Sequence, residues 1–199
     1  MSSENSQASD VEKSHELFKA IEQGDHGRVY NIMARQYHGT TNWDSCLQLA
    51  CALGKPDYVQ LLLATHADIE HADSEGNTPL SIACRRGQKD CVQLLLAAHA
   101  AIDQANRNGN TPLCAACWHD HADCVQLLLA AHAAIDQANS NGATPLSIAC
   151  GGGHSDCVQL LLAAHTAIDQ ADGNGFTPLM AASAYGYLDI VKRLVQAGA

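Results

Sequence analysis

Residues 90–106 read DCVQLLLAAHAAIDQAN, and the same string returns unchanged at residues 123–139 and with two substitutions at residues 156–172. Each copy is followed by a short turn and the tripeptide Thr-Pro-Leu, and one further Thr-Pro-Leu precedes the first copy. The threonines of these tripeptides, Thr78, Thr111, Thr144 and Thr177, are 33 residues apart. A fixed period of this length is typical of stacked-repeat proteins, in which each unit contacts only its neighbours and the array binds with an extended face.

Within one period, local signals predict two helices. Thr78 suits a helix N-cap, and the proline after it suits the first helical position, where its missing N–H costs nothing. An apolar stretch follows and is ended by Gly87. A second helix is expected from near Asp90, whose carboxylate favours a helix N-terminus, to near His99. Residues 102–110 carry Asn and Gly and are expected to return the chain by a turn.

These residues resemble the ankyrin repeat, whose signature opens with Thr-Pro-Leu-His-x-Ala and continues with Ala-x-x-Gly-His, Val-x-Leu-Leu-Leu and Gly-Ala-Asp. Here residues 78–88 read TPLSIACRRGQ and residues 92–96 read VQLLL, and earlier units are recognisable at residues 45–63 and 15–33. The resemblance implies an all-α ankyrin-repeat solenoid of stacked helix-turn-helix units with protruding β-turn loops. It implies a repeat domain over residues 14–199, with units starting near residues 15, 45, 78, 111, 144 and 177, of which the first and last act as caps. Residues 1–13 are expected to form a disordered tail.

Composition limits the classes of partner. The net charge of −10 and the lack of a Lys/Arg run argue against nucleic acid. The longest apolar stretches, such as Leu94–Ala98, are far shorter than the ~20 residues of a membrane helix, so we expect no membrane partner. Met1–Lys13 is polar and Ser-rich and lacks the apolar stretch of a signal peptide, which favours an intracellular protein.

The nine cysteines follow the same period. Seven of them fall into two columns, which are Cys51, Cys84, Cys117 and Cys150, and Cys91, Cys124 and Cys157. Equivalent residues of neighbouring repeats are expected roughly 10 Å apart, whereas a disulfide needs Cα atoms within about 4.4–6.8 Å. We interpret the columns as small buried hydrophobes of a protein in the reducing cytoplasm, with the nucleus as an alternative.

A histidine column replaces a glycine of the family pattern. His66, His99, His132 and His165 stand where ankyrin repeats carry the Gly that ends the second helix in the left-handed conformation. Histidine tolerates this conformation better than most residues, at a cost of up to ~1 kcal/mol relative to Gly. The alternatives are a passively duplicated variant and a functional role as a pH sensor or metal site. A spacing near 10 Å disfavours a shared metal, because zinc needs nitrogens within ~2.1 Å.

Residues 114–124 contain a second set of potential ligands, Cys114, Cys117, His121 and Cys124. A zinc site is conceivable here, but two of these cysteines belong to the repeating columns and His121 matches the family's usual His after the turn. We therefore expect no metal and no cofactor. Paired carboxylates, nucleophile–base pairs and phosphate-binding loops are missing from the sequence, so we expect no enzyme.

In the ankyrin family the concave binding face is formed by the loop tips and by two variable positions late in the first helix. The partner-binding residues that this implies are Trp43, Asp44, Glu75, Asn77, Arg85, Arg86, Arg107, Asn108, Asn110, Trp118, His119, Asn141, Phe176 and Tyr185. These positions differ between units whose second helices barely vary, since Arg85-Arg86 becomes Trp118-His119 and then Gly151-Gly152. Trp, Tyr and Arg are also common interface anchors. Drift at exposed positions is the alternative interpretation.

Two functions remain open at this point. The first is a protein-binding module, monomeric when unbound, that acts on an unidentified partner protein as an adaptor, inhibitor or effector. The second is a metal- or redox-responsive structural protein that uses the Cys and His content. We expect the partner to contact the region between Arg86 and Trp118, with Phe176 and Tyr185 as a second apolar spot and residues 151–153 as a low patch between them.

Overall fold

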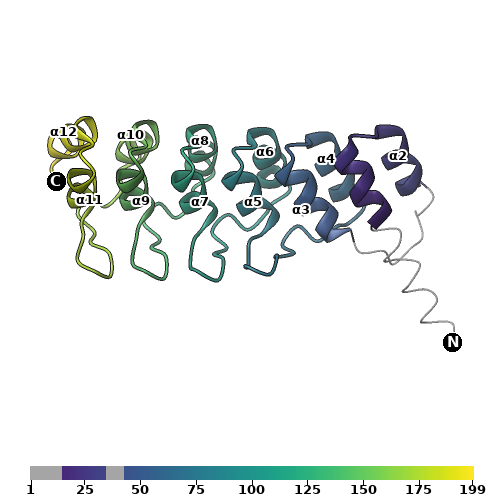
Figure 1. Cartoon of the computed structure of the whole chain (residues 1–199), viewed down its shortest axis with the longest axis horizontal. Helices are drawn as coiled ribbons and strands as arrows, with labels where there is room; N and C mark the ends of the chain where they lie inside the picture. Colours follow the sequence, from purple (N-terminus) through teal and green to yellow (C-terminus); the bar gives the residue numbers. More distant parts are fainter. Residues whose placement is uncertain (1–14, 35–42) are drawn as a thin grey trace.

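The computed structural model describes residues 15–34 and 43–199, and every regular element within them is an α-helix. The helices form pairs that stand in a row from one terminus to the other, and the long loops between pairs project to one side (Figure 1). The first helices of the pairs are residues 15–23, α3 (Asp44–Ala52), α5 (Pro79–Arg85), α7 (Pro112–Trp118), α9 (Pro145–Gly152) and α11 (Pro178–Ala184). The second helices are α2 (His26–Ala34), α4 (Pro56–Ala64), α6 (Lys89–Ala97), α8 (Ala122–Ala130), α10 (Ser155–Ala163) and α12 (Leu188–Ala197).

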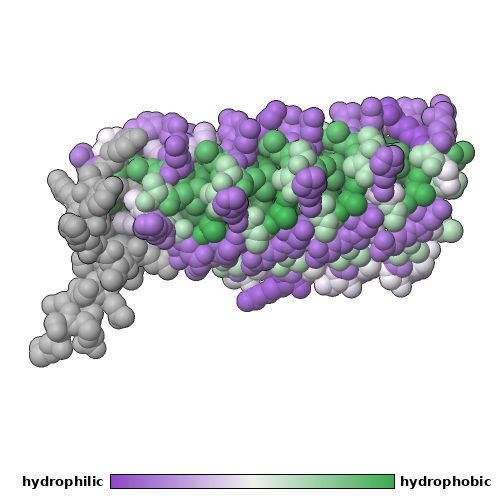
Figure 2. Space-filling model, turned by 180° about the vertical axis from the view of Figure 1, so that it is seen from behind, coloured by the Kyte–Doolittle hydropathy of each residue, from purple (hydrophilic) through white to green (hydrophobic). Residues whose placement is uncertain are grey.

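The helices make two layers. First helices pack against one another in order from α3 to α11, and second helices do the same from α4 to α12. The core between the layers repeats with the sequence, and Leu80, Leu113 and Leu146 are fully buried at equivalent positions. Seen from the other side, hydrophobic residues form a band along the array that hydrophilic residues interrupt at regular intervals (Figure 2). This architecture confirms the predicted all-α solenoid.

The first helices begin as the sequence predicts. The Thr78 hydroxyl accepts a hydrogen bond from the backbone N–H of Ser81 at 3.2 Å, and a proline occupies the first turn. Thr111, Thr144 and Thr177 cap α7, α9 and α11 in the same way. Each cap satisfies an N–H that the helix itself leaves unpaired, and such caps are each worth about 1 kcal/mol.

The loops between repeats are tied to one another. In three successive interfaces one backbone N–H donates to a carbonyl of the preceding loop: Arg107 to Glu75, Ser140 to Asn108, and Gly173 to Asn141. Gly109 has a φ of +75°, and a Cβ at this position would lie 2.6 Å from the backbone nitrogen of Ser140. A glycine is therefore required where one loop tip approaches the next. These bonds hold the loop tips in a fixed row beside the helices.

The cysteine prediction is confirmed for burial. All nine thiols are free and buried. Burial raises the pKa of Cys91 and of Cys124 from the ordinary value of 9.0 to about 11, with a smaller contribution from a neighbouring carboxylate. A buried neutral thiol is a poor nucleophile and a poor metal ligand, because both roles need the thiolate.

The histidine column has the backbone conformation that the family pattern predicts. His66, His99, His132 and His165 have φ angles of 62°, 64°, 64° and 61°. All four side chains are exposed. In the last pair the equivalent position is Gly198, which ends α12 with a φ of 105°. Of the five equivalent sites that the structure describes, four thus hold a histidine in a conformation that favours glycine.

The ends of the array complete the fold. The expected tail at residues 1–13 and the loop at residues 35–42 lie outside the described residues. At the other end, Met180, Leu188 and Val195 are each more than half exposed, so the last pair is less polar than a cap is expected to be. In the parts of the chain that the structure describes, no helix is long and apolar enough to cross a bilayer.

Candidate partner-binding face

The fold brings the ends of the first helices and the tips of the loops to one face. The two variable positions are the last residue and the C-cap of α5, α7 and α11, as in Trp118 and His119, and the last two residues of α9. Loop-tip residues and helix ends line the same two hollows, which we call the polar hollow and the apolar hollow. Trp118 lines both of them. The two sets of positions that the sequence analysis selected are therefore neighbours in space.

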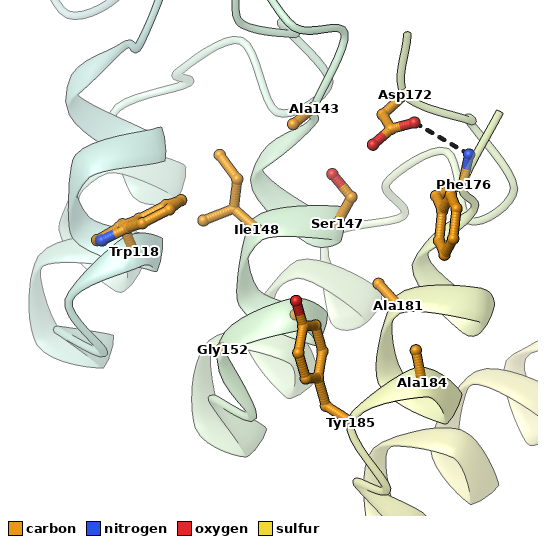
Figure 3. A pocket seen from close by; sticks show the side chains of 11 residues that line it. Trp118, Ala143, Ser147, Ile148, Gly152, Asp172, Phe176, Ala181, Ala184 and Tyr185 are labelled. Atoms are coloured by element: carbon orange, nitrogen blue, oxygen red, sulfur yellow. Dashed lines mark hydrogen bonds between the residues drawn. The ribbon is translucent and has the colours of Figure 1, made fainter. Parts of the chain in front are cut away.

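The apolar hollow spans α7, α9 and α11 and has a volume of about 720 Å³. Trp118 stands at one side of it, and Phe176 and Tyr185 stand at the other (Figure 3). The exposed fractions of these three side chains are 65%, 50% and 69%, which are large values for aromatic residues. Gly151 and Gly152 line the hollow between them. The volume is thus open because glycine occupies the positions that hold Trp and His one repeat earlier.

Several lining residues of the apolar hollow were missed by the sequence analysis. Ile148 of α9 and Ala181 of α11 lie in the lining between the aromatic residues (Figure 3). Ile148 precedes Gly151 by three residues and therefore shares its helical face. This spacing was the signal that would have found it.

The polar hollow has a volume of about 240 Å³ and lies on the other side of Trp118. It joins the end of α5 to the loop tips, and its lining includes Glu75, Arg85, Asn108 and His119. Burial lowers the pKa of His119, and His121, Arg85 and Arg86 lower it further. The imidazole of His119 therefore lies in the positive field of neighbouring basic residues.

The helix ends that carry these side chains are held by the following repeat. His121 Nε2 donates to the carbonyl oxygen of Arg85 at 3.2 Å, and His154 Nε2 donates to that of Trp118 at the same distance. These bonds satisfy carbonyl groups that the helix ends leave unpaired. His121 and His154 stand at the position of the family's usual His after the turn, and these bonds give that position a structural role. They hold the backbone at Arg85 and at Trp118, which carry two of the site side chains.

Three predicted site residues have little exposed surface in the structure. Trp43 is only 6% exposed and belongs to the core, and its φ of −99° differs from the positive φ of the glycines at the equivalent positions of the other repeats. Asn77 is 4% exposed, although it lines the polar hollow. Its amide donates to the Asp73 carboxylate, and its side-chain oxygen accepts from Asn106 at 2.9 Å. Asp44 accepts from the backbone N–H of Asp68 at 2.7 Å, so its carboxylate ties the start of α3 to the loop after α4.

The remaining loop-tip residues keep exposed or half-exposed side chains. Glu75, Arg107, Asn108 and Asn141 are exposed. Asn110 is half-buried, and its side-chain oxygen accepts from Asn139 at 2.9 Å. The row of loop tips is thus stiffened from within by Asn–Asn bonds while its outer side chains stay free to contact a partner.

The conceivable zinc ligands do not gather into a site. Cys114, Cys117 and Cys124 are buried, and His121 is bonded to the carbonyl of Arg85. Cys114 contacts the carbonyl of Gln137 through its sulfur. Among the described residues, the group whose ligand atoms all lie within 4.8 Å of one another is a different one, namely Asp44, Asp68 and His71.

That acidic group has a structural explanation. Asp44 accepts from the backbone N–H of Asp68, and the equivalent N–H groups of the next repeats, at Ala101 and Ala134, are bound by the carboxylates of Glu70 and Asp103. A carboxylate therefore accepts from this N–H in each of these repeats without a metal ligand set. Asp44 supplies the carboxylate from within the same repeat, and Glu70 and Asp103 supply it from the preceding loop.

Comparison with known proteins agrees with the geometry. A family model described as ankyrin repeats (3 copies) matches residues 17–104, 47–139 and 129–199. The chain therefore belongs to the ankyrin repeat family. Repeats of this family are generally modules of protein–protein interaction and are generally not enzymes. No curated protein matches the chain.

Proposed function

We propose that this chain binds another protein through the face formed by the ends of α5, α7, α9 and α11 and by the adjoining loop tips, and that it acts as an adaptor, inhibitor or effector. One observation carries the proposal: three aromatic side chains, each at least half exposed, surround a hollow of about 720 Å³. Soluble proteins seldom leave such aromatic surface in contact with water unless it binds something. Large aromatic side chains at the centre of a face are also typical interface anchors.

The structure of the face favours a partner protein over a small substrate. Its lining comes from loop tips and helix ends of several repeats. The residues around it are aromatic, Arg and Asn side chains, a composition common in protein interfaces. The acidic net charge of −10 supports a protein and not a nucleic acid as the partner.

The alternative of a metal- or redox-responsive protein has less support. The thiols are buried, and their pKa values are raised where a shift is resolved. We propose an intracellular location, since nine free thiols persist in a reducing compartment. We also propose that the unbound chain is a monomer.

Affinity capture from an extract of the source cells tests the proposal. The bait is the wild-type chain, the double variant Arg86→Ala/Trp118→Ala, or the matched control Gln93→Ala/Gln126→Ala, whose exposed side chains lie on the second helices of the same repeats. We expect the wild type and the control to capture the same protein and the Arg86/Trp118 variant to lose it, with equal melting temperatures for all three. Retention of the protein by the Arg86/Trp118 variant would contradict the proposed face.

A further inference from the structure

Basic groups without acceptors gather at one end of the face. Arg85 and Arg86 lie at the end of α5, and no salt bridge or side-chain hydrogen bond joins either of them to an acceptor among the described residues. Arg85 Nε is buried and lacks an acceptor within that part of the chain. A buried N–H of this kind costs about 1–3 kcal/mol until it is satisfied. An acceptor from a partner can reach the exposed Arg86 and the side of Arg85 that lines the polar hollow.

The nearby carboxylates do not fill this role. Asp73 accepts hydrogen bonds from the backbone N–H groups of Glu75 and Asn77 and from the Asn77 amide, so its oxygens are engaged within the loop. Glu75 is exposed at the loop tip and makes no ion pair with an arginine of the described residues. In a chain with a net charge of −10, Arg85 lines the polar hollow, and the charges of Arg85 and Arg86 both act on His119 in the same lining.

The apolar hollow lies two repeats further along the same face. Trp118 separates it from the polar hollow and lines both, so that a ligand can cross from one to the other over the exposed indole. Neighbouring repeats are spaced at about 10 Å, the usual distance between packed helices, so Arg86 and Gly152 are about 20 Å apart. An extended chain covers this distance with about six residues.

We propose that the partner presents an extended protein segment that places a carboxylate on Arg85 and Arg86, crosses Trp118, and seats a large apolar side chain in the hollow beside Gly151 and Gly152. The acidic and apolar residues of the segment lie four to seven positions apart. Charge complementarity with the arginines selects the acidic residue of the segment, and the volume between Trp118 and Tyr185 selects its large apolar residue. This inference rests on the proposed function and adds the chemistry of the bound segment.

Selection from a library of random 12-residue peptides tests the inference, with the wild-type chain immobilised and the enriched peptides then synthesised and measured by fluorescence anisotropy. We expect enriched peptides to carry Asp or Glu four to seven positions from Phe, Trp, Leu, Ile or Met, in either chain direction. Arg86→Glu is expected to weaken their binding about tenfold or more, as the loss of a charge-assisted contact does. The control Lys55→Glu makes the same change of charge at an exposed site at the start of the second helix α4 and is expected to have little effect.

Gly151→Leu tests the apolar position. A Cβ at Gly151 meets nothing within 4 Å, so the leucine fits without strain and fills part of the hollow. We expect it to abolish peptide binding without lowering the melting temperature.

The outcomes separate the two proposals. Two results would overturn the inference and leave the proposed function standing. In the first, the enriched peptides lose binding to Gly151→Leu but lack an acidic residue. In the second, they bind Arg86→Glu and Lys55→Glu equally well. A library without any enriched peptide would overturn it too. Peptides indifferent to both Gly151→Leu and Arg86→Glu, combined with a captured protein that the Arg86/Trp118 variant retains, would contradict the proposed function itself.

Discussion

Replacing the histidine column by glycine is expected to stabilise the array. His66, His99, His132 and His165 all have φ angles between 61° and 64°, and their side chains are exposed. The left-handed conformation costs a non-glycine residue about 1–2 kcal/mol, with histidine at the lower end. Glycine removes this strain but loses more conformational entropy on folding, which offsets part of the gain. The net gain is about 0.5–1 kcal/mol per site, or about 2–4 kcal/mol for the four substitutions together.

Thermal unfolding followed by circular dichroism measures this gain. For a chain of this size 1 kcal/mol shifts the melting temperature by about 2–4 °C, so the quadruple variant is expected to melt roughly 5–15 °C above the wild type. The matched control is His119→Gly, because His119 has a φ of −106° and glycine relieves no strain there. A melting temperature that falls, or that rises equally in the control, would refute the strain argument and show that the four histidines make stabilising contacts.

Three further predictions concern the same chain. Gly151→Ala should raise the free energy of unfolding by about 0.5–1 kcal/mol, because alanine is the better helix former and its Cβ meets no atom; denaturant unfolding checks this, and a decrease would contradict the open space at this position. Gly109→Ala should destabilise the chain by about 1–3 kcal/mol, since the alanine Cβ would contact the backbone of Ser140. The control is Gly175→Ala, because Gly175 has a similar positive φ but no atom within 4 Å of an added Cβ, and it should destabilise the chain less. The raised pKa values of Cys91 and Cys124 predict that stability is fully present below pH 9 and declines as pH rises towards 11, because the unfolded chain releases thiol protons that the folded chain keeps; unfolding curves with a constant midpoint across this range would disagree.

Features that depend on local chemistry could be predicted from the sequence. The 33-residue period, the threonine caps and the left-handed histidines each depend on a few neighbouring residues, and the structure shows them at the expected positions. The burial of cysteines was also predictable, because a column that repeats with the period occupies one environment in every unit.

Features that depend on the packing of neighbouring repeats could not be predicted in the same way. Trp43 was placed on the binding face because of its position in the period, but it is buried in the core. Asn77 is hidden because Asn106 of the next loop bonds to it. The apolar hollow arises from three repeats at once: Trp118 in one, glycines in the next, and Tyr185 in the third. The repeat period describes a single unit, so it does not predict a hollow that combines residues of three units.

Hydroxyl-radical footprinting of the complex with the captured partner tests the proposed face most directly. Trp118, Phe176 and Tyr185 are exposed in the free chain and react readily, so their oxidation can be followed by mass spectrometry. Binding at the proposed face predicts strong protection of these three side chains and unchanged oxidation of Leu188, which is 62% exposed and lines neither hollow. Unchanged oxidation of the three aromatic residues, together with protection on α8 and α10, would contradict it.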